Sequence, residues 1–275
     1  MNPISARIAG YEVGDGKKLL LIAGPCVMEN EGHALAHARK VKALAAKHGL
    51  PVVFKASFDK ANRSSGKSFR GPGLEAGLAA FEAVKRETGL PCTTDVHETW
   101  QAEPAGRVVD LLQVPAFLCR QTDLVMACAR HGKSVSVKKG QFLAPREMRH
   151  AVAKCREAGN ANVMLIERGA TFGYGNLVVD MRAFPIMREL GVPVCLDATH
   201  SVQLPGGAGD VTGGERQFVA PLARAAAAVG IDALFMEIHE DPAAARSDGP
   251  NSLDFEAADR VLADVLKIRR ALGQP

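Results

Sequence analysis

The chain has 275 residues, of which 47% are hydrophobic and 23% charged, and its formal net charge is +4. This composition is ordinary for a globular protein and excludes extended disorder, and the length lies in the range that one α/β barrel occupies. We therefore expect one domain that covers residues 1–275 and is built around a single continuous core.

The patterns of charge and hydropathy exclude several classes of partner. The 34 basic residues form no concentrated run, and two Tyr and one Trp offer few stacking surfaces, so nucleic acid is not an expected partner. No apolar run approaches the roughly 20 residues of a membrane helix, and the N-terminus has no signal-peptide pattern. The six cysteines show no close-spaced framework, so we expect reduced thiols in a cytoplasmic protein without membrane contacts.

In chain order, residues 1–18 come before any regular pattern, and we expect them to form a short hairpin that caps the bottom of the fold. Eight short, mostly apolar segments then follow at helical spacing and are predicted as strands: 19–25, 52–57, 91–96, 111–115, 135–140, 162–169, 193–201 and 233–240. The segments between them carry apolar residues on one helical face, for example at Ala34, Ala38, Val41 and Leu44.

A glycine precedes six of these strands and is expected to end the helix before it: Gly49, Gly89, Gly132, Gly159, Gly191 and Gly230. Eight strand and helix units predict a closed (β/α)8 TIM barrel. The alternative is an open doubly wound sheet. Its dinucleotide-binding version requires a G-x-G-x-x-G motif after the first strand, and this chain has none there.

Polar residues gather at the ends of the predicted strands. Strands of a parallel barrel are buried on both faces, so charged groups are tolerated mainly at the mouth, where the active sites of such barrels lie. The residues in these positions are Cys26, Lys55, Asp95, Gln113, Lys138, Arg168, Asp197, His200, Glu237 and His239. Any one of these cations alone is equally well explained as a solvated residue or an ion-pair partner.

Together, five cations would converge on the mouth and favour substrates with several phosphate and carboxylate groups. They are Lys55, Lys60, Arg63, Lys138 and Arg168. The long polar segment after the second strand, residues 54–73, is predicted as a binding loop. The glycine-rich segment 203–217 has the composition of a lid that closes over substrate, although a merely flexible surface loop would look the same.

Cys26, His200, Glu237 and Asp248 are the candidate metal ligands. A thiolate, an imidazole and two carboxylates favour a borderline transition metal over Mg²⁺ or Ca²⁺. No C-x-x-C spacing supports the site, and a lone Cys after a strand is more often a buried apolar residue. A closed barrel would bring the first, seventh and eighth strands together, which makes both readings of Cys26 tenable. The other five cysteines are expected to be packing residues.

Long motifs of this chain resemble the 3-deoxy-D-manno-octulosonate 8-phosphate synthases over about residues 19–251. The motifs are LIAGPC, FKASFDKANRSS, SFRGPG, TTDVHE, LLQVPAFLCRQTDL, VSVKKGQFLAP, ERGATFGYGNLVVDMR, DATHSVQLPGG and FMEIHEDP. The resemblance implies a (β/α)8 barrel, usually a homotetramer. It also implies the condensation of phosphoenolpyruvate with D-arabinose 5-phosphate, with release of phosphate, on the route to lipopolysaccharide.

The resemblance also implies roles for single residues. It sets Lys55, Lys60, Gln113, Ala116 (through its backbone), Lys138 and Arg168 around phosphoenolpyruvate, and Asn62, Arg63 and Ser64 around the sugar and its distal phosphate. Arg120 would reach a neighbouring subunit's site, Asp95 would lie near the reacting end of the sugar, and Gln203 would join the substrate-binding set. The catalytic set would be Lys55, Lys60, Asp95, Lys138 and His200.

The position of Cys26 separates two classes of this family, because metal-dependent members have Cys there and metal-independent members have Asn. This chain has Cys, and its SDGPN stretch, residues 247–251, is similar to the metal-dependent pattern. The resemblance therefore implies one divalent transition metal per subunit, held by Cys26, His200, Glu237 and Asp248. Zn, Fe, Mn and Co all accept such ligands.

Two other functions are considered. The related 3-deoxy-heptulosonate 7-phosphate synthases use erythrose 4-phosphate and share the Cys-containing GPC start, but their sugar loop resembles K-P-R-T where this chain has KANRSS. That difference favours the five-carbon sugar. A non-catalytic anion-binding barrel would need the cations but not the four metal ligands, since a fold does not by itself establish a function.

Overall fold

Eight parallel strands close into a barrel in the computed structural model, which describes residues 4–63, 65–208 and 211–275. The barrel strands are, in order around the barrel, β3 (Leu20–Gly24), β4 (Val52–Lys55), β5 (Cys92–Asp95), β6 (Leu111–Val114), β7 (Val135–Lys138), β8 (Val163–Glu167), β11 (Val194–Asp197) and β14 (Ala233–Glu237). All eight predicted strands are confirmed, and the predicted TIM barrel is correct. Their residues are buried on both faces, as expected for short parallel strands covered by helices.

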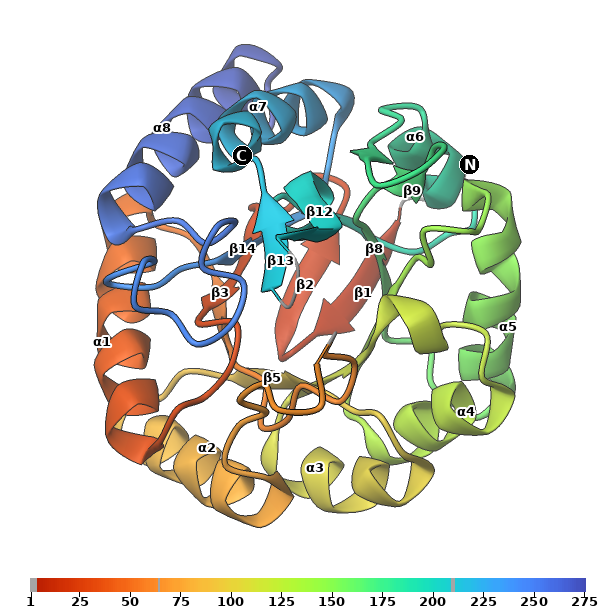
Figure 1. Ribbon diagram of the computed structural model, residues 1–275. Coiled ribbons are helices and arrows are strands. Elements are labelled where there is room, and N and C mark those ends of the chain that lie inside the picture. The colour runs from red at the N-terminus through yellow and green to blue at the C-terminus, as the bar shows by residue number, and fades with distance from the viewer. Residues whose placement is uncertain (1–3, 64, 209–210) are drawn as a thin grey trace.

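A ring of helices surrounds the barrel in the view along its axis (Figure 1). The helices are α1 (Glu31–His48), α2 (Leu74–Thr88), α3 (Ala102–Val108), α4 (Thr122–His131), α5 (Arg149–Glu157), α6 (Ala183–Arg188), α7 (Val219–Val229) and α8 (Phe255–Ala271). Short 3-10 turns, η1 (Thr99–Gln101), η2 (Ala116–Leu118), η3 (Pro145–Met148), η4 (His200–Val202) and η5 (Arg216–Phe218), lie in the connections.

Local sequence explains where α1 begins and ends. The Asn30 side chain accepts a hydrogen bond from the His33 backbone N–H, and Glu31 adds a negative charge in the first turn. Gly49 ends the helix with φ of 64°, in the left-handed region. The stripe that includes Ala34, Ala38 and Val41 is buried against the sheet, as its periodicity predicts.

Gly132 is the exception among the six glycines expected to end helices. The other five have positive φ, whereas Gly132 has φ of −83°. It is required for space instead, because a Cβ there would lie 2.7 Å from the Cys128 carbonyl oxygen. The chain turns from α4 into β7 at this close approach.

The N-terminal residues form the predicted hairpin. Strands β1 (Ser5–Ile8) and β2 (Tyr11–Gly14) pair antiparallel. Ile8 and Val13 are buried in one cluster with inward-facing barrel residues such as Ile22 and Phe235. The Ala9 backbone N–H also donates to Ser134 Oγ, just before β7, so the hairpin closes the N-terminal end of the barrel.

Two further hairpins follow strands at the opposite end, β9 (Ala170–Thr171) with β10 (Leu177–Val178), and β12 (Gln203–Ala208) with β13 (Val211–Gly214). The glycine-rich segment predicted as a loop is thus largely two paired strands, because backbone pairing needs no large side chains. The register of this pair shifts between Leu204 and Ala208. In Figure 1 the hairpin lies across the middle of the ring of helices.

All six cysteines are buried and free, as expected for reduced thiols, and the five outside the candidate site are packing residues. None of the helices in the described ranges combines the length and apolarity that a membrane crossing requires.

Candidate active site and metal centre

The carboxyl ends of the barrel strands carry the predicted polar residues into one buried mouth. Lys55 ends β4, Asp95 ends β5, Lys138 ends β7, and Glu237 ends β14, and each is almost fully buried. Their positions follow from the parallel register, which aligns the last residue of each strand at one rim. The sequence predicts this arrangement, because the polar residues stand at the ends of successive strands.

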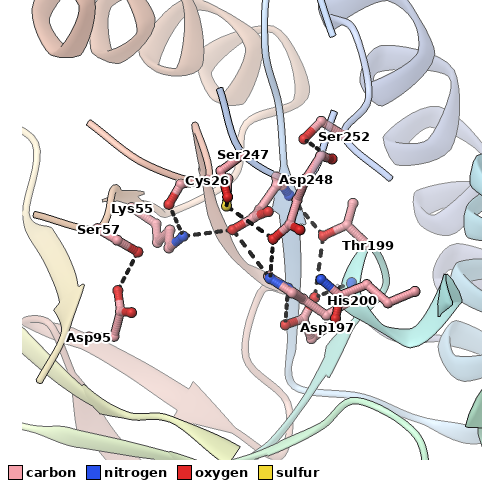
Figure 2. Close-up of polar contacts among 12 residues, drawn as sticks. Cys26, Lys55, Ser57, Asp95, Asp197, Thr199, His200, Ser247, Asp248 and Ser252 are labelled. Atoms are coloured by element: carbon pink, nitrogen blue, oxygen red, sulfur yellow. Dashed lines mark hydrogen bonds and ion pairs between the residues drawn. The ribbon is translucent and has the colours of Figure 1, made fainter. Parts of the chain in front are cut away.

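Cys26 leaves β3 through a constricted backbone. Gly24 lies so close to β4 that a Cβ would come within 2.0 Å of the Lys55 carbonyl oxygen. The Cys26 thiol then lies 3.0 Å from Ser247 Oγ and 3.1 Å from Asp248 Oδ2 (Figure 2). The predicted meeting of the first strand with the segment after the last strand is therefore present.

His200 is oriented toward the same point by Asp197. Its Nδ1 lies 2.7 Å from Asp197 Oδ2, and its Nε2 lies 3.4 Å from Glu237 Oε1 and 3.7 Å from Asp248 Oδ2. A histidine that donates one ring N–H to a carboxylate turns the lone pair of its other nitrogen toward a metal. Figure 2 shows Asp197 behind His200 on the side away from Cys26.

The donor set fits a borderline transition metal. One donor atom from each of Cys26, Glu237 and Asp248 lies within 4.8 Å of the other two, and all three residues are buried. Among the residues that the structure describes, Glu237 Oε2 has no hydrogen-bond partner, and it is buried, which leaves one carboxylate oxygen for a ligand. His200 lies outside this compact group but contacts two of its members. Sulfur, nitrogen and oxygen donors together suit Zn²⁺, Fe²⁺, Mn²⁺ or Co²⁺.

The charge states of the ligands differ. Burial raises the pKa of the Cys26 thiol well above its usual value, and the Asp248 and Glu237 carboxylates raise it further. Burial also disfavours the charged form of Glu237, but His200, Lys55 and Lys60 outweigh it and lower that pKa to about 2. A metal ion must therefore displace a proton from Cys26 but not from Glu237, which makes binding weaken as the pH falls.

Two lysines flank the carboxylate of Glu237. Lys55 Nζ donates to Glu237 Oε1 at 2.7 Å and to the Cys26 carbonyl oxygen at 2.8 Å, while Lys60 Nζ lies 3.9 Å from the same carboxylate. Burial lowers the pKa of Lys60, but the surrounding negative groups outweigh burial and hold it well above its usual value. Lys60 is therefore a cation held in a buried site.

Lys138 and Arg168 supply positive charge from the other side of the mouth. Lys138 Nζ donates to Asp197 Oδ2 at 2.5 Å, and burial still lowers the pKa of this lysine below its usual value. Arg168 donates to the His200 carbonyl oxygen at 3.3 Å and to Gln203 Oε1. Gln203, at the start of β12, thus links the hairpin to the predicted anion-binding set.

Asp95 lies in a small polar group of its own. It accepts a hydrogen bond from Ser57 Oγ, as Figure 2 shows, and its Oδ2 lies 3.2 Å from His97 Nε2. Burial raises the pKa of this carboxyl, but Lys60 and His97 outweigh burial and bring it well below its usual value. Asp95 is therefore a buried anion beside the cationic residues.

The predicted sugar loop touches the metal-ligand segment. Arg63 donates to Ser247 Oγ at 2.7 Å and to the Arg246 carbonyl oxygen at 3.0 Å. Asn62 is exposed. The prediction for Ser64 lies outside the described residues. Because Ser247 also contacts the Cys26 thiol, one hydroxyl connects the sugar loop with a candidate metal ligand.

The remaining predicted residues lie on and after β6. Gln113 and Ala116 are buried at the mouth, Gln113 in β6 and Ala116 at the first residue of η2. Arg120 is exposed, and its carbonyl oxygen accepts a hydrogen bond from Lys154 Nζ on α5. The structure therefore keeps Arg120 on the outer surface of this chain, and its role at a neighbouring site stays a prediction.

The residues that sequence reasoning missed are the partners of predicted ones. Asp197 stood at a strand end but was given no role, and Ser57, His97 and Ser247 were not singled out as site residues. Their contacts join segments up to 221 positions apart, as between Cys26 and Ser247. Asp197 could have been found from its position at the end of a strand, three residues before His200.

The fold and this mouth define a class of protein: a (β/α)8 barrel that holds several buried cations beside a candidate transition-metal site. Residues 3–271 match the model of the DAHP synthetase I family, and the chain belongs to this family.

Similar curated proteins carry a more specific name. The chain is 55% identical over 266 residues to the 2-dehydro-3-deoxyphosphooctonate aldolase of Syntrophotalea carbinolica, which covers 97% of this chain and 96% of that one. It is 56% identical over 265 residues to the protein of the same name from Synechococcus sp., covering 96% and 93%. The corresponding Koribacter versatilis protein is 54% identical over 272 residues, covering 98% and 97%.

Proposed function

We propose that this chain condenses phosphoenolpyruvate with D-arabinose 5-phosphate and water to give 3-deoxy-D-manno-octulosonate 8-phosphate and phosphate. The observation that carries the proposal is the convergence of Lys55, Lys60, Lys138 and Arg168 on one buried mouth beside Cys26. Relatives with more than half of their residues identical carry a name for this activity. The KANRSS loop favours the five-carbon sugar over erythrose 4-phosphate.

The chemistry requires two polyanions to meet although they repel each other. Lys55, Lys60, Lys138 and Arg168, with Gln113 and the Ala116 backbone, would hold phosphoenolpyruvate, and Arg63, Asn62 and Ser64 would hold the sugar and its phosphate. Fixing C3 of phosphoenolpyruvate against the aldehyde carbon can contribute on the order of 7 to 11 kcal/mol to such a bimolecular step. The cations at both ends supply this orientation.

The proposed reaction begins with the new carbon–carbon bond and ends with the release of phosphate. The C2–C3 double bond of phosphoenolpyruvate attacks the aldehyde carbon, and positive charge develops at C2. Water adds at C2 and gives up one proton, which balances the proton taken up by the oxygen of the former aldehyde. The bond between C2 and the phosphate oxygen then breaks, the C2 ketone forms, and the second proton of the water leaves with the phosphate. Asp95, which is a buried anion with a pKa well below its usual value, is suited to accept a hydrogen bond near the reacting end of the sugar.

We further propose that Cys26, His200, Glu237 and Asp248 hold one divalent transition metal per subunit. When bound, such an ion would orient the sugar aldehyde or a water and lower the pKa of that water. The Asp197 carboxylate supports this proposal by fixing the His200 ring with Nε2 toward Glu237 and Asp248.

The substrate proposal is tested by product analysis. Purified protein with phosphoenolpyruvate and arabinose 5-phosphate should release one phosphate for each eight-carbon phosphorylated product detected by mass spectrometry. A non-catalytic anion-binding barrel would return phosphoenolpyruvate unchanged with every divalent metal supplied, and that outcome would refute the proposal.

The metal proposal is tested by chelation and by substitution at Cys26. Activity should disappear on chelation, return with a divalent transition metal, and be lost in Cys26→Ala. Cys92→Ala is a matched control, since Cys92 is a buried thiol on a neighbouring part of the barrel. Full activity of metal-free wild-type protein, or of Cys26→Ala, would contradict the assignment.

The proposed assembly is a homotetramer in which Arg120 reaches a neighbouring site. Large exposed apolar side chains follow three adjacent strands: Phe117 after β6, Phe142 after β7, and Phe172 and Tyr174 after β8. An apolar surface of this kind favours self-association. The exposed guanidinium of Arg120 follows the same strand as Phe117, so this face could carry it to another copy.

A further inference from the structure

Three histidines and a glutamate form a second cluster that the proposed reaction does not use. His33 and His37 lie on α1, and His239 follows β14 by two residues. Glu29 lies just before α1, with its carboxylate facing two of the rings. We propose that His33, His37, His239 and Glu29 form a second site for a borderline transition metal such as Zn²⁺.

The geometry brings the donor atoms together. One ring nitrogen from each of His33, His37 and His239 lies within 4.8 Å of the other two. The ring centroids are 4.1 Å apart for His33 and His37, 4.9 Å for His37 and His239, and 5.3 Å for His33 and His239. Two histidines four residues apart share one helical face, the spacing that metal-binding helices use.

His37 uses both ring nitrogens: its Nε2 accepts a long hydrogen bond from the Glu240 backbone N–H at 3.4 Å, the bond that a metal ion would replace. The His37 Nδ1 lies 2.9 Å from the His33 carbonyl oxygen, so Nδ1 carries the proton and donates, and Nε2 keeps its lone pair. Metal-binding histidines typically donate their other ring N–H to a carbonyl or carboxylate in this way. His37 therefore has the tautomer that coordination requires.

The Nε2 atoms of His33 and His239 face each other. These atoms are 3.2 Å apart, and Glu29 Oε1 lies 3.9 Å from the first and 3.8 Å from the second. At most one of the two nitrogens can place a proton between them, so at least one lone pair faces the gap. His33 Nδ1 is buried and has no hydrogen-bond partner in the described part of the chain.

The charge state of the cluster also suits a cation. Burial, with the neighbouring His239 next in effect, lowers the pKa of His33 to about 4. Burial also lowers the pKa of His37 to about 4, with His33 next in effect. Neutral imidazoles are the metal-binding form, and the Glu29 carboxylate supplies negative charge.

Two contacts must change when the site is filled. The Glu240 backbone N–H loses its bond to His37 Nε2, and a bond to His239 changes as well. The Asp241 backbone N–H donates to His239 Nδ1 at 3.1 Å, which gives Nε2 the proton in the neutral ring. A metal on Nε2 moves that proton to Nδ1 and breaks the Asp241 contact. Binding is therefore coupled to a local rearrangement of the chain just after His239.

The position of the cluster indicates what the ion would do. Glu29 lies three residues after Cys26, and His239 lies two residues after Glu237. Arg246 Nε, in the segment that leads to Asp248, is 3.7 Å from Glu29 Oε2. An ion held here would fix the positions of the chain segments that carry Cys26, Glu237 and Asp248. The three histidines and Glu29 are therefore positioning residues.

Cobalt titration of metal-free protein tests this proposal because it distinguishes the two sites. Cobalt at Cys26 gives a thiolate-to-cobalt absorption band, whereas cobalt at the histidine cluster gives ligand-field bands without it. We expect wild-type protein to retain two cobalt ions per chain after gel filtration, one of them with the thiolate band. The His33→Gln/His37→Gln protein should retain one, with the thiolate band unchanged.

Matched variants control for folding and for adventitious binding. His131→Gln/His150→Gln removes two exposed histidines, on α4 and α5, and should still bind two ions. His37→Gln alone should weaken the ion without the thiolate band by about tenfold or more, and its circular dichroism should match wild type. Two results would overturn the proposal. One is a second ion that persists in His33→Gln/His37→Gln, and the other is wild-type protein that binds a single ion with the thiolate band. One ion without a thiolate band, lost in that double variant, would support this site and contradict the Cys26 site.

Discussion

At the scale of single residues, Asp197 has the most connected position in the mouth. Its carboxylate accepts a hydrogen bond from His200 Nδ1 on one side and from Lys138 Nζ on the other. Burial raises the pKa of Asp197, but these two neighbours outweigh burial and hold the pKa far below its usual value. One carboxylate therefore orients a candidate metal ligand and a candidate substrate-binding cation.

Asp197→Asn keeps the shape of the side chain and removes its charge. The amide no longer stabilises the proton on His200 Nδ1, so we expect the metal affinity to fall about 10- to 100-fold, the range typical of residues that orient metal ligands. The measurement is the metal dissociation constant together with kcat. Asp180→Asn, at an exposed residue bonded to Arg182, should change neither; equal losses in the two variants would contradict this role.

Residue positions were predictable where strand order fixes them, and contact partners were not. Lys55 and Glu237 end the two strands on either side of β3, so their meeting at the mouth follows from the parallel register. The contacts of Ser247 depend on how a long turn folds back over Cys26, which no local pattern encodes. No site was predicted at His33 and His37, although their H-x-x-x-H spacing is visible in the sequence. The apolar stripe of α1 indicates packing alone.

At the scale of elements, the β12–β13 hairpin is held against the turn that precedes α8. Gly214 of β13 lies against Asn251, where a Cβ would come within 1.3 Å of Asn251 Oδ1. Arg216 donates to the Gly249 carbonyl oxygen next to it. Small residues in this hairpin are therefore needed for close packing, in addition to the backbone freedom that their composition suggests.

Gly214→Ala should displace this hairpin from residues 249–251. Because Gln203 at its start bonds Arg168, we expect a rise of about tenfold in the KM for phosphoenolpyruvate, the effect of one lost charged hydrogen bond. Steady-state kinetics measure it. Gly32→Ala, where the nearest atom to a new Cβ is a side-chain oxygen at 3.4 Å, should leave this KM unchanged. An unchanged KM in Gly214→Ala would show that the hairpin does not position Arg168.

Asp110 joins three elements on the outside of the barrel and gives a prediction about pH. It accepts from Lys85 of α2 at 2.7 Å, from Lys133 at 2.9 Å and from the Cys92 N–H at 3.0 Å. Burial raises its pKa, but these bonds outweigh burial and lower it. The stabilisation is thus present above the unfolded-state pKa of about 3.9 and is lost as the pH falls toward the lower folded-state value.

Asp110→Asn should lower the melting temperature near pH 7 by about 2–4 °C, the shift that about 1 kcal/mol produces in a chain of roughly this size. The drop in melting temperature between pH 6 and pH 3 should become smaller, because one carboxylate no longer loses its partners. Calorimetry across this range measures both effects. Glu82→Gln, at an exposed residue in the middle of α2, should leave the melting temperature at pH 7 unchanged. A larger drop in melting temperature between pH 6 and pH 3 in Asp110→Asn than in wild type would contradict the predicted direction.

The elements were predictable because helix and strand periodicities differ strongly in this chain. Each barrel strand is a short apolar run after a helix with a buried stripe, and both patterns are local. The β12–β13 pair was predicted as a loop because its glycines have low strand propensity. The pairing of Gly213 with Leu204 and of Gly214 with Gln203, and the packing of Gly214 on Asn251, depend on contacts that the local sequence does not encode.

At the scale of the whole molecule, the proposed tetramer predicts a function for Arg120 that one chain cannot show. Arg120→Ala should raise the KM for arabinose 5-phosphate about 10- to 100-fold, as loss of a charged contact does, while the metal content stays constant. Arg130→Ala, at an exposed residue of α4, is the control. A normal KM in Arg120→Ala, with the tetramer intact by light scattering, would remove Arg120 from the site.

The most direct test of the central claim compares two sugars under one set of conditions. Phosphate release from phosphoenolpyruvate is followed with metal-loaded protein and either arabinose 5-phosphate or erythrose 4-phosphate, and kcat/KM is determined for each sugar. The account predicts rapid release with arabinose 5-phosphate and hardly any with erythrose 4-phosphate. A preference for erythrose 4-phosphate, or no release with either sugar, would contradict it.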